Sequence, residues 1–240
     1  MCKDKDISEG LDLTGFGAVA KAIPPEVYTQ SANTIIETFN KLTAPITETT
    51  SGFGRYIKQK FDNMVDAEKA LATYTVQNAI AKAEAKTTKS GTLIISTVHQ
   101  KSFVKSIEEA SKETDPTLHE MWENLLANQL TNTNSHPHFV EILPHFSPEE
   151  ANILMSLFPV DEIGEHGGGY LSYSVESFKH WIRNTDDTQL KEWNYSCALL
   201  LEFKFADVMV PKKGQYKYDD GVTILFKTNA GNTFLSAVSQ

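Results

Sequence analysis

Residues 135–159 read SHPHFVEILPHFSPEEANILMSLFP, and their pattern organises the middle of the chain. The second half predicts a helix, because Ser147 can cap the first turn, Pro148 suits the first helical position and Glu150 completes a capping box. The expected inward face of this helix consists of Ile153, Leu154, Leu157 and Phe158. We therefore expect a well-defined helix that begins at residue 148.

The first half of the stretch places three of the seven histidines of the chain within ten positions. A zinc site needs about four nitrogen or sulfur ligands. His136, His138 and His145 could supply three of them, and His119 or Glu123 could supply a fourth. Neither cysteine is close in sequence, so the spacing is weak evidence for a metal.

The alternative is a short helix that begins at His136-Pro137 and ends at Pro144. Its inward-facing residues would be Phe139, Val140, Ile142 and Leu143. This helix accounts for every apolar residue of the stretch, whereas a zinc site accounts for none. We therefore interpret the three histidines as helix-end residues at a joint between two regions, and we predict neither a metal nor a cofactor.

Upstream of this joint, apolar residues recur at helical intervals. Residues 25–42 predict an amphipathic helix, which Pro45 and Gly52 interrupt. Residues 53–86 contain no proline and predict one helix of roughly thirty residues, about 45 Å long. The alternative for this segment is a helix broken near residues 73–75.

A short β-prone stretch at 92–98 separates these helices from two more within residues 102–130. Asp115 can cap the second of the two, with Pro116 at its first position. The expected buried stripe of that helix consists of Leu118, Met121, Trp122, Leu125, Leu126, Gln129 and Leu130.

The composition changes after Pro159, where short elements follow one another. We expect a glycine-rich loop (164–175), a short helix (174–182), a longer helix (187–203), two strands (201–210 and 221–227) and a closing helix (228–240). This order is typical of a winged-helix-like module. The sequence thus predicts a mainly α fold, with an N-terminal helical region at 1–145 and a small winged-helix-like α+β region at 146–240.

The charge balance and cysteine content limit the partners and the compartment. The chain has 22 Lys and Arg against 31 Asp and Glu, a net charge of -9, which opposes non-specific attraction to nucleic acid or anionic lipid. Cys2 and Cys197 lie too far apart to build a disulfide framework, which indicates a reducing compartment. The first ten residues lack a signal-peptide pattern and no apolar run reaches about 18 residues. We expect a cytoplasmic protein without a membrane partner.

Three short patterns resemble catalytic motifs but lack required parts. HEMWE at 119–123 has Glu123 where a zinc-protease helix needs its second histidine. GEHGGG at 164–169 has no lysine followed by serine or threonine, as a phosphate-binding loop requires. Cys197 with His180 is the one nucleophile pair worth naming, and helical periodicity predicts that Cys197 is buried and inert.

The net negative charge of the C-terminal module opposes DNA binding through it. Residues 147–240 contain eight Lys and Arg and thirteen Asp and Glu, a difference of -5. The expected wing carries Lys212, Lys213 and Lys217, which could contact phosphate or a protein partner. Protein contact is the favoured interpretation, and a solvated hairpin tip is the alternative.

The run from Asp115 to Pro159 resembles the core of the abortive infection alpha family, small bacterial proteins associated with phage defence. The resemblance lies in these residues: Asp115-Pro116, Trp122, Leu125-Leu126, Pro137, Phe139-Val140, Leu143, Ser147-Pro148 and Glu150-Ala151. Residues 10–28 and 228–238 also resemble the ends of such proteins. The resemblance implies a role in antiviral defence, and it supplies no catalytic set to transfer.

The leading hypothesis is therefore a cytoplasmic phage-defence protein that acts without catalysis. It would bind another protein or self-associate, and cause growth arrest or death during infection. A winged-helix transcriptional regulator is one alternative, and a metal-dependent hydrolase or nuclease centred on the histidines is another. Membrane disruption by residues 15–23 and the long helix is a further alternative without other support.

Overall fold

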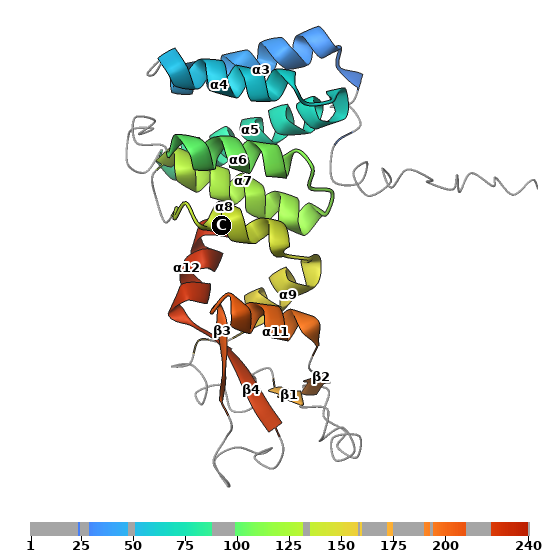
Figure 1. Cartoon of the computed structure of the whole chain (residues 1–240), viewed down its shortest axis with the longest axis vertical. Helices are drawn as coiled ribbons and strands as arrows, with labels where there is room; N and C mark the ends of the chain where they lie inside the picture. Colours follow the sequence, from blue (N-terminus) through green and yellow to red (C-terminus); the bar gives the residue numbers. More distant parts are fainter. Residues whose placement is uncertain are drawn as a thin grey trace, which may run out of the picture.

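A computed structural model describes the chain in separate ranges, namely residues 24, 29–47, 51–87, 99–131, 135–157, 159, 172–174, 190–192, 194–209 and 222–239. Most of the described residues are helical, and a small sheet lies toward the C-terminal part of the chain. The helices follow one another along the long axis of the molecule, and the sheet lies at the end opposite the first helices (Figure 1). This arrangement confirms the predicted fold class.

Helices α3 (Ala32–Thr47) and α4 (Ser51–Asp62) form the end of the molecule far from the sheet (Figure 1). The rings of Phe39 in α3 and Phe61 in α4 stack at 3.8 Å between centroids, and both are fully buried. Part of the first predicted helix, residues 25–28, lies outside the described residues. The expected break at Pro45 is wrong, because α3 continues through it to Thr47.

Helix α5 (Asp66–Thr87) is the longest described helix, but the expected start of a single long helix near Phe53 is wrong. The chain turns between Asp62 and Asp66, where the amide of Met64 donates to the carbonyl of Phe61 at 3.1 Å. This hydrogen bond spans three residues instead of four, so the last turn is tight and α4 ends there without a glycine or proline. The turn buries Phe61 and leaves Val65 63% exposed.

A break near residues 73–75 is also wrong, because α5 is continuous there. Thr73 Oγ1 donates to the Lys69 carbonyl and Thr75 Oγ1 donates to the Leu71 carbonyl, each at 2.8 Å. Both hydroxyls are thus satisfied one turn back within the helix, so these threonines do not interrupt it.

Helices α6 (Gln100–Ala110) and α7 (Pro116–Thr131) confirm the predicted pair. Asp115 Oδ1 accepts hydrogen bonds from the amides of Thr117 at 2.9 Å and Leu118 at 3.1 Å, as a capping residue does. Helix α7 is buried along almost its whole length and packs against α5, α6 and later helices. It is the central element of the fold.

The joint after α7 consists of α8 (Phe139–Ile142), a 3-10 turn η2 (Leu143–His145) and α9 (Pro148–Ser156). The four apolar residues expected to face inward are buried: Phe139, Val140, Ile142 and Leu143. Ser147 and Glu150 form the predicted capping box at the start of α9. Phe158 lies outside the described residues.

The C-terminal part contains α11 (Tyr195–Glu202) and a sheet of four described strands in the order β2-β1-β4-β3. The strands are β1 (Ser172–Ser174), β2 (Leu190–Glu192), β3 (Ala206–Met209) and β4 (Val222–Lys227). Strands β3 and β4 pair antiparallel, as predicted, β4 also pairs antiparallel with β1, and β1 pairs parallel with β2.

Several predicted boundaries in this part are wrong, and one of them is the start of the strand expected at 201–210, which begins only at Ala206. The helix expected at 187–203 is shorter, because Leu190–Glu192 is a strand and α11 begins only after the cap at Asn194. The expected loop at 164–175 contains strand β1. The short helix expected at 174–182 cannot begin at Ser174, which lies in strand β1, and residues 175–182 are outside the described residues. The strand expected at 92–98 is outside them as well.

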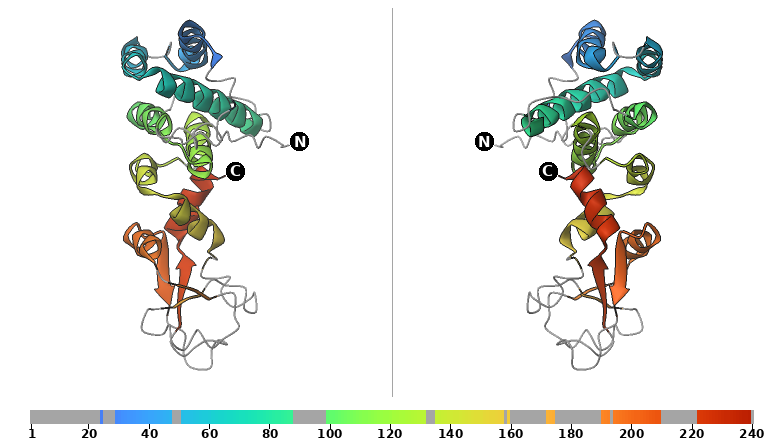
Figure 2. Two further views of the ribbon diagram at one scale, coloured as in Figure 1. Left: turned by 90° about the vertical axis from the view of Figure 1, so that its right-hand side faces the viewer. Right: turned by 90° about the vertical axis from the view of Figure 1, so that its left-hand side faces the viewer.

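The closing helix α12 (Asn229–Val238) returns from the sheet toward the middle of the molecule (Figures 1 and 2). There it packs against α7 and α9, so the C-terminal helix and the helical region share one hydrophobic core. Phe234 of α12 stacks on Phe205 with centroids 4.5 Å apart. The predicted division of the chain at residues 145 and 146 remains a prediction.

Candidate binding groove

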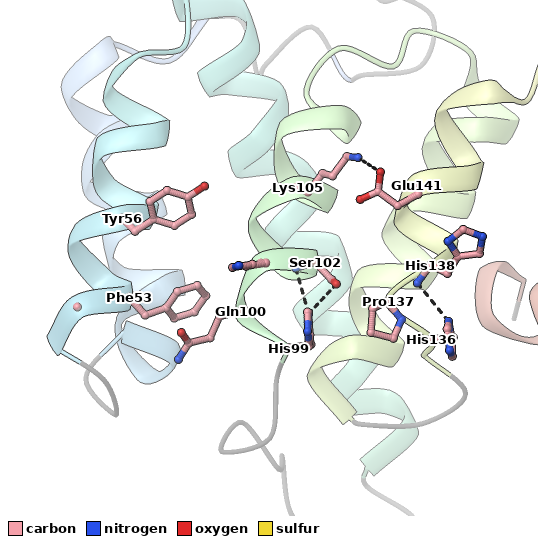
Figure 3. A pocket seen from close by; sticks show the side chains of 12 residues that line it. Phe53, Tyr56, His99, Gln100, Ser102, Lys105, His136, Pro137, His138 and Glu141 are labelled. Atoms are coloured by element: carbon pink, nitrogen blue, oxygen red, sulfur yellow. Dashed lines mark hydrogen bonds and ion pairs between the residues drawn. The ribbon is translucent and has the colours of Figure 1, made fainter.

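An open groove of about 1060 Å³ lies over the first turns of α6. Phe53 and Tyr56 of α4 form one wall, and the segment from His136 to Glu141 forms the other (Figure 3). Residues of α6 and its cap form the floor between the walls: His99, Gln100, Lys101, Ser102 and Lys105. Three segments far apart in sequence therefore meet at one concave surface.

His99 is the N-cap of α6, a role that helices usually give to serine, threonine, aspartate or asparagine. Its Nδ1 accepts from the Ser102 amide at 3.4 Å and lies 2.7 Å from Ser102 Oγ (Figure 3). Because Nδ1 accepts the amide hydrogen, the hydrogen of the neutral ring is on Nε2. His99 thus offers one N–H donor beyond its capping role.

His136 and His138 precede α8, and both are exposed. The His138 amide donates to His136 Nδ1 at 3.2 Å, so a neutral His136 also carries its hydrogen on Nε2. The two rings lie edge to face, with centroids 6.4 Å apart. Pro137 between them also lines the groove (Figure 3).

The charged side chains of the groove are two lysines and one carboxylate. Lys105 of α6 forms an ion pair with Glu141 of α8, which joins the floor to one wall (Figure 3). Lys101 has no carboxylate partner within the described ranges. The groove therefore carries a surplus of positive charge on a chain whose net charge is -9.

The other two histidines considered as zinc ligands lie elsewhere. His145 ends η2, and its ring centroid is 6.0 Å from that of Phe203. His119 lies within α7 and is buried. In the part of the chain that the structure describes, no group of three or more His, Cys, Asp and Glu side chains is placed to hold a metal ion.

His119 belongs to a buried polar network between α5 and α7. Its Nε2 lies 3.3 Å from Thr75 Oγ1 and 3.6 Å from Glu123 Oε1. Burial lowers the pKa of His119, and the neighbouring Glu123 carboxylate opposes this shift. Glu123 also accepts from Asn78 Nδ2 at 2.6 Å and pairs with Lys82 Nζ at 2.9 Å. Glu123 therefore joins α5 to α7.

The remaining candidates from the sequence fall outside the groove or outside the described residues. Lys212, Lys213, Lys217 and His180 belong to the undescribed ranges. Cys197 is a free, fully buried thiol in α11, and burial raises its pKa. A buried thiol of raised pKa is a poor nucleophile.

The sequence reasoning missed the groove as a site, together with His99 and Tyr56. It found His136 and His138 but placed them in a cluster with His145, which the fold separates from them. The signal for His99 was local: it directly precedes an amphipathic run, and Ser102 follows three positions later. Tyr56 carried no such signal, since its role depends on how α4 lies beside α6.

The described helices include none that is both long and apolar enough to cross a membrane. Residues 15–23, the segment considered for membrane disruption, are not among the described residues.

Comparison with known protein families shows that the chain matches a family model described as abortive infection alpha over residues 70–217. The matched span covers more than half of the chain and includes all the residues between 115 and 159 on which the sequence resemblance rests. Residues 10–28 and 228–238 lie outside it, so their resemblance stays a prediction. Neither the curated proteins nor the solved structures contained a match.

Proposed function

The chain belongs to the abortive infection alpha family, and from this membership we propose that it is a phage-defence protein of the bacterial cytoplasm. In this role it limits phage multiplication by stopping the growth of the infected cell or killing it. The family match over residues 70–217 is the observation that carries the proposal.

We further propose that the protein acts by binding, either to another protein or to a second copy of itself, and not by catalysis. The family-like residues support this part. Asp115, Ser147 and Glu150 serve as helix caps, and Trp122, Leu125 and Leu126 are buried in the core. A family pattern made of caps and core residues specifies a scaffold, and a scaffold acts through its surface.

Expression in a bacterial host tests the defence role. Cells that produce the protein and cells with an empty vector are challenged with a broad panel of phages, and plaques are counted. We expect plaque numbers to fall for at least one phage. Unchanged plaque numbers across the panel would contradict the role.

Copurification tests the binding mode. The tagged protein is isolated after crosslinking from infected and uninfected cells, and its mass in solution is measured by light scattering. We expect either a protein partner enriched in infected cells or a species larger than the monomer of 26.7 kDa. A monomer without an enriched partner in both conditions would contradict this mode.

A winged-helix transcriptional regulator remains the second candidate. The antiparallel β3–β4 pair supports it as the hairpin of a winged module, although the sheet also contains β2, which pairs parallel with β1. The net charge of -9 opposes it. A mobility shift that weakens steeply with salt and requires Lys212, Lys213 and Lys217 would favour this candidate over protein binding.

A further inference from the structure

The groove over α6 has the dimensions of a small-molecule site. Its volume of about 1060 Å³ lies just above the usual range of ligand pockets, about 300–1,000 Å³. Side chains from α4, α6 and the segment before α8 converge on it (Figure 3). Sites of this kind combine apolar walls with a few placed polar groups, and both components are present here.

The net positive charge of the groove favours the binding of anions. Lys105 neutralises the one carboxylate of the lining, Glu141, so the positive charge of Lys101 is left over. The net charge of the chain is -9, so the protein as a whole does not favour anions. The positive charge of the groove therefore favours anion binding here.

Two histidines supply directional donors for such an anion. The Nδ1 atoms of His99 and His136 already accept backbone amide hydrogens, so both neutral rings have their hydrogen on Nε2. The rings come from different segments, one before α6 and one before α8, and both line the groove. The first turn of α6 beside them adds the partial positive charge of a helix N-terminus.

The opposite wall offers an aromatic surface. Tyr56 is 44% exposed, whereas the neighbouring Phe53 is 5% exposed. Lys60 Nζ lies 5.8 Å from the centroid of the Tyr56 ring. An exposed ring at the edge of a groove can stack on a planar group of a ligand.

We propose that this groove binds a small phosphorylated ligand with a heteroaromatic ring, which is the chemistry of a nucleotide. The phosphate lies against Lys101 and the Nε2–H groups of His99 and His136. The ring of the ligand stacks on Tyr56. This site does not depend on the defence role proposed above, since it rests on the groove alone.

Calorimetric titration of the full chain tests the site with four probes: AMP, ribose phosphate, adenosine and a glutamate-rich peptide. If phosphate and ring are both recognised, AMP binds about tenfold more tightly than ribose phosphate or adenosine, because each fragment lacks one contact. The peptide carries negative charge without phosphate or a ring, so we expect no binding from it.

Substitutions at Lys101 and Tyr56 test the proposed contacts with the phosphate and with the ring of the ligand. Lys101→Glu should weaken AMP binding by about tenfold or more, because it reverses the charge beside the phosphate. The matched control is Lys58→Glu, which makes the same change on the exposed part of α4 outside the groove. Tyr56→Ala should weaken AMP binding about tenfold and leave ribose phosphate unaffected, whereas Tyr56→Phe keeps the ring and the affinity.

Three results would overturn the site. One is the absence of binding by AMP, ribose phosphate and adenosine at concentrations up to about 5 mM, which corresponds to only about 3 kcal/mol of affinity. Another is equal AMP affinity in the Lys101→Glu and Lys58→Glu variants, with both folded as judged by circular dichroism. The third is binding of the glutamate-rich peptide in preference to AMP, which would assign the groove to a protein ligand.

Discussion

Asn128 Nδ2 in α7 donates a hydrogen bond of 2.7 Å to the carbonyl of Ala237 in α12, across 109 residues of sequence. Asn124, one turn earlier in α7, donates to the Val238 carbonyl at 3.1 Å. The last carbonyls of a helix have no partner within it, so these two amides cap the C-terminal end of α12. The final helix of the chain is thereby held against the central one.

Asn128→Ala should lower the free energy of unfolding by about 1–3 kcal/mol, because it leaves the buried carbonyl of Ala237 without this donor. Urea unfolding measures the change. The control is Asn152→Ala, on an exposed position of α9, which should change stability by less than about 0.5 kcal/mol. Equal effects of the two substitutions would contradict the capping role.

Gly231 of α12 approaches the preceding chain so closely that it tolerates no side chain. A Cβ at this position would lie 2.1 Å from the carbonyl oxygen of Phe205. Gly231→Ala should therefore cost about 1–3 kcal/mol of stability through backbone displacement. In contrast, a Cβ at Gly52 of α4 meets nothing within 4 Å, so Gly52→Ala should stabilise the protein by up to about 1 kcal/mol. Thermal unfolding of both variants checks the opposite signs.

The buried His119 should make stability depend on pH. Burial lowers its pKa below the ordinary value of 6.5, so between the two values the unfolded chain binds more protons than the folded one. The free energy of unfolding should then decrease as the pH falls below about 6.5, by up to about 1.4 kcal/mol per pH unit. Of the charged side chains near His119, Glu123 opposes the shift and Lys82 adds to it.

His119→Gln removes this titrating group and should flatten the dependence. Urea unfolding at fixed ionic strength, at several values from about pH 7.5 to pH 5.5, compares the two proteins. A steeper loss of stability in the wild type is expected, since ordinary carboxylates stay ionised over most of this range. If the free energy of unfolding changed with pH equally in the wild type and the variant, His119 would bind its proton equally in the folded and unfolded chains, contrary to this prediction.

The parts of the fold that the sequence predicted well depend on neighbours in the chain. The caps at Asp115 and Ser147 act on amides two to three residues away, so the residue types alone indicate them. The buried face of residues 139–143 follows in the same way from the spacing of apolar residues. Here local preference and tertiary packing agree.

The features that the sequence missed depend on distant contacts. The turn at residues 63–65 has no glycine or proline, and it arises where Phe61 stacks on Phe39 of another helix. Strand β2 exists through its pairing with β1, although its residues also suit a helix. The groove combines residues near 53, 101 and 138, and no pattern within any one segment reveals that they meet.

The proposed defence role requires that this protein limits phage multiplication in the infected cell. The most direct measurement is a one-step growth experiment with a phage whose plaques the protein reduces, in which phage yield per infected cell and survival of infected cells are counted together. We predict a reduced yield and no recovery of the infected cells, compared with cells that carry the empty vector. A full phage yield per infected cell would contradict the claim.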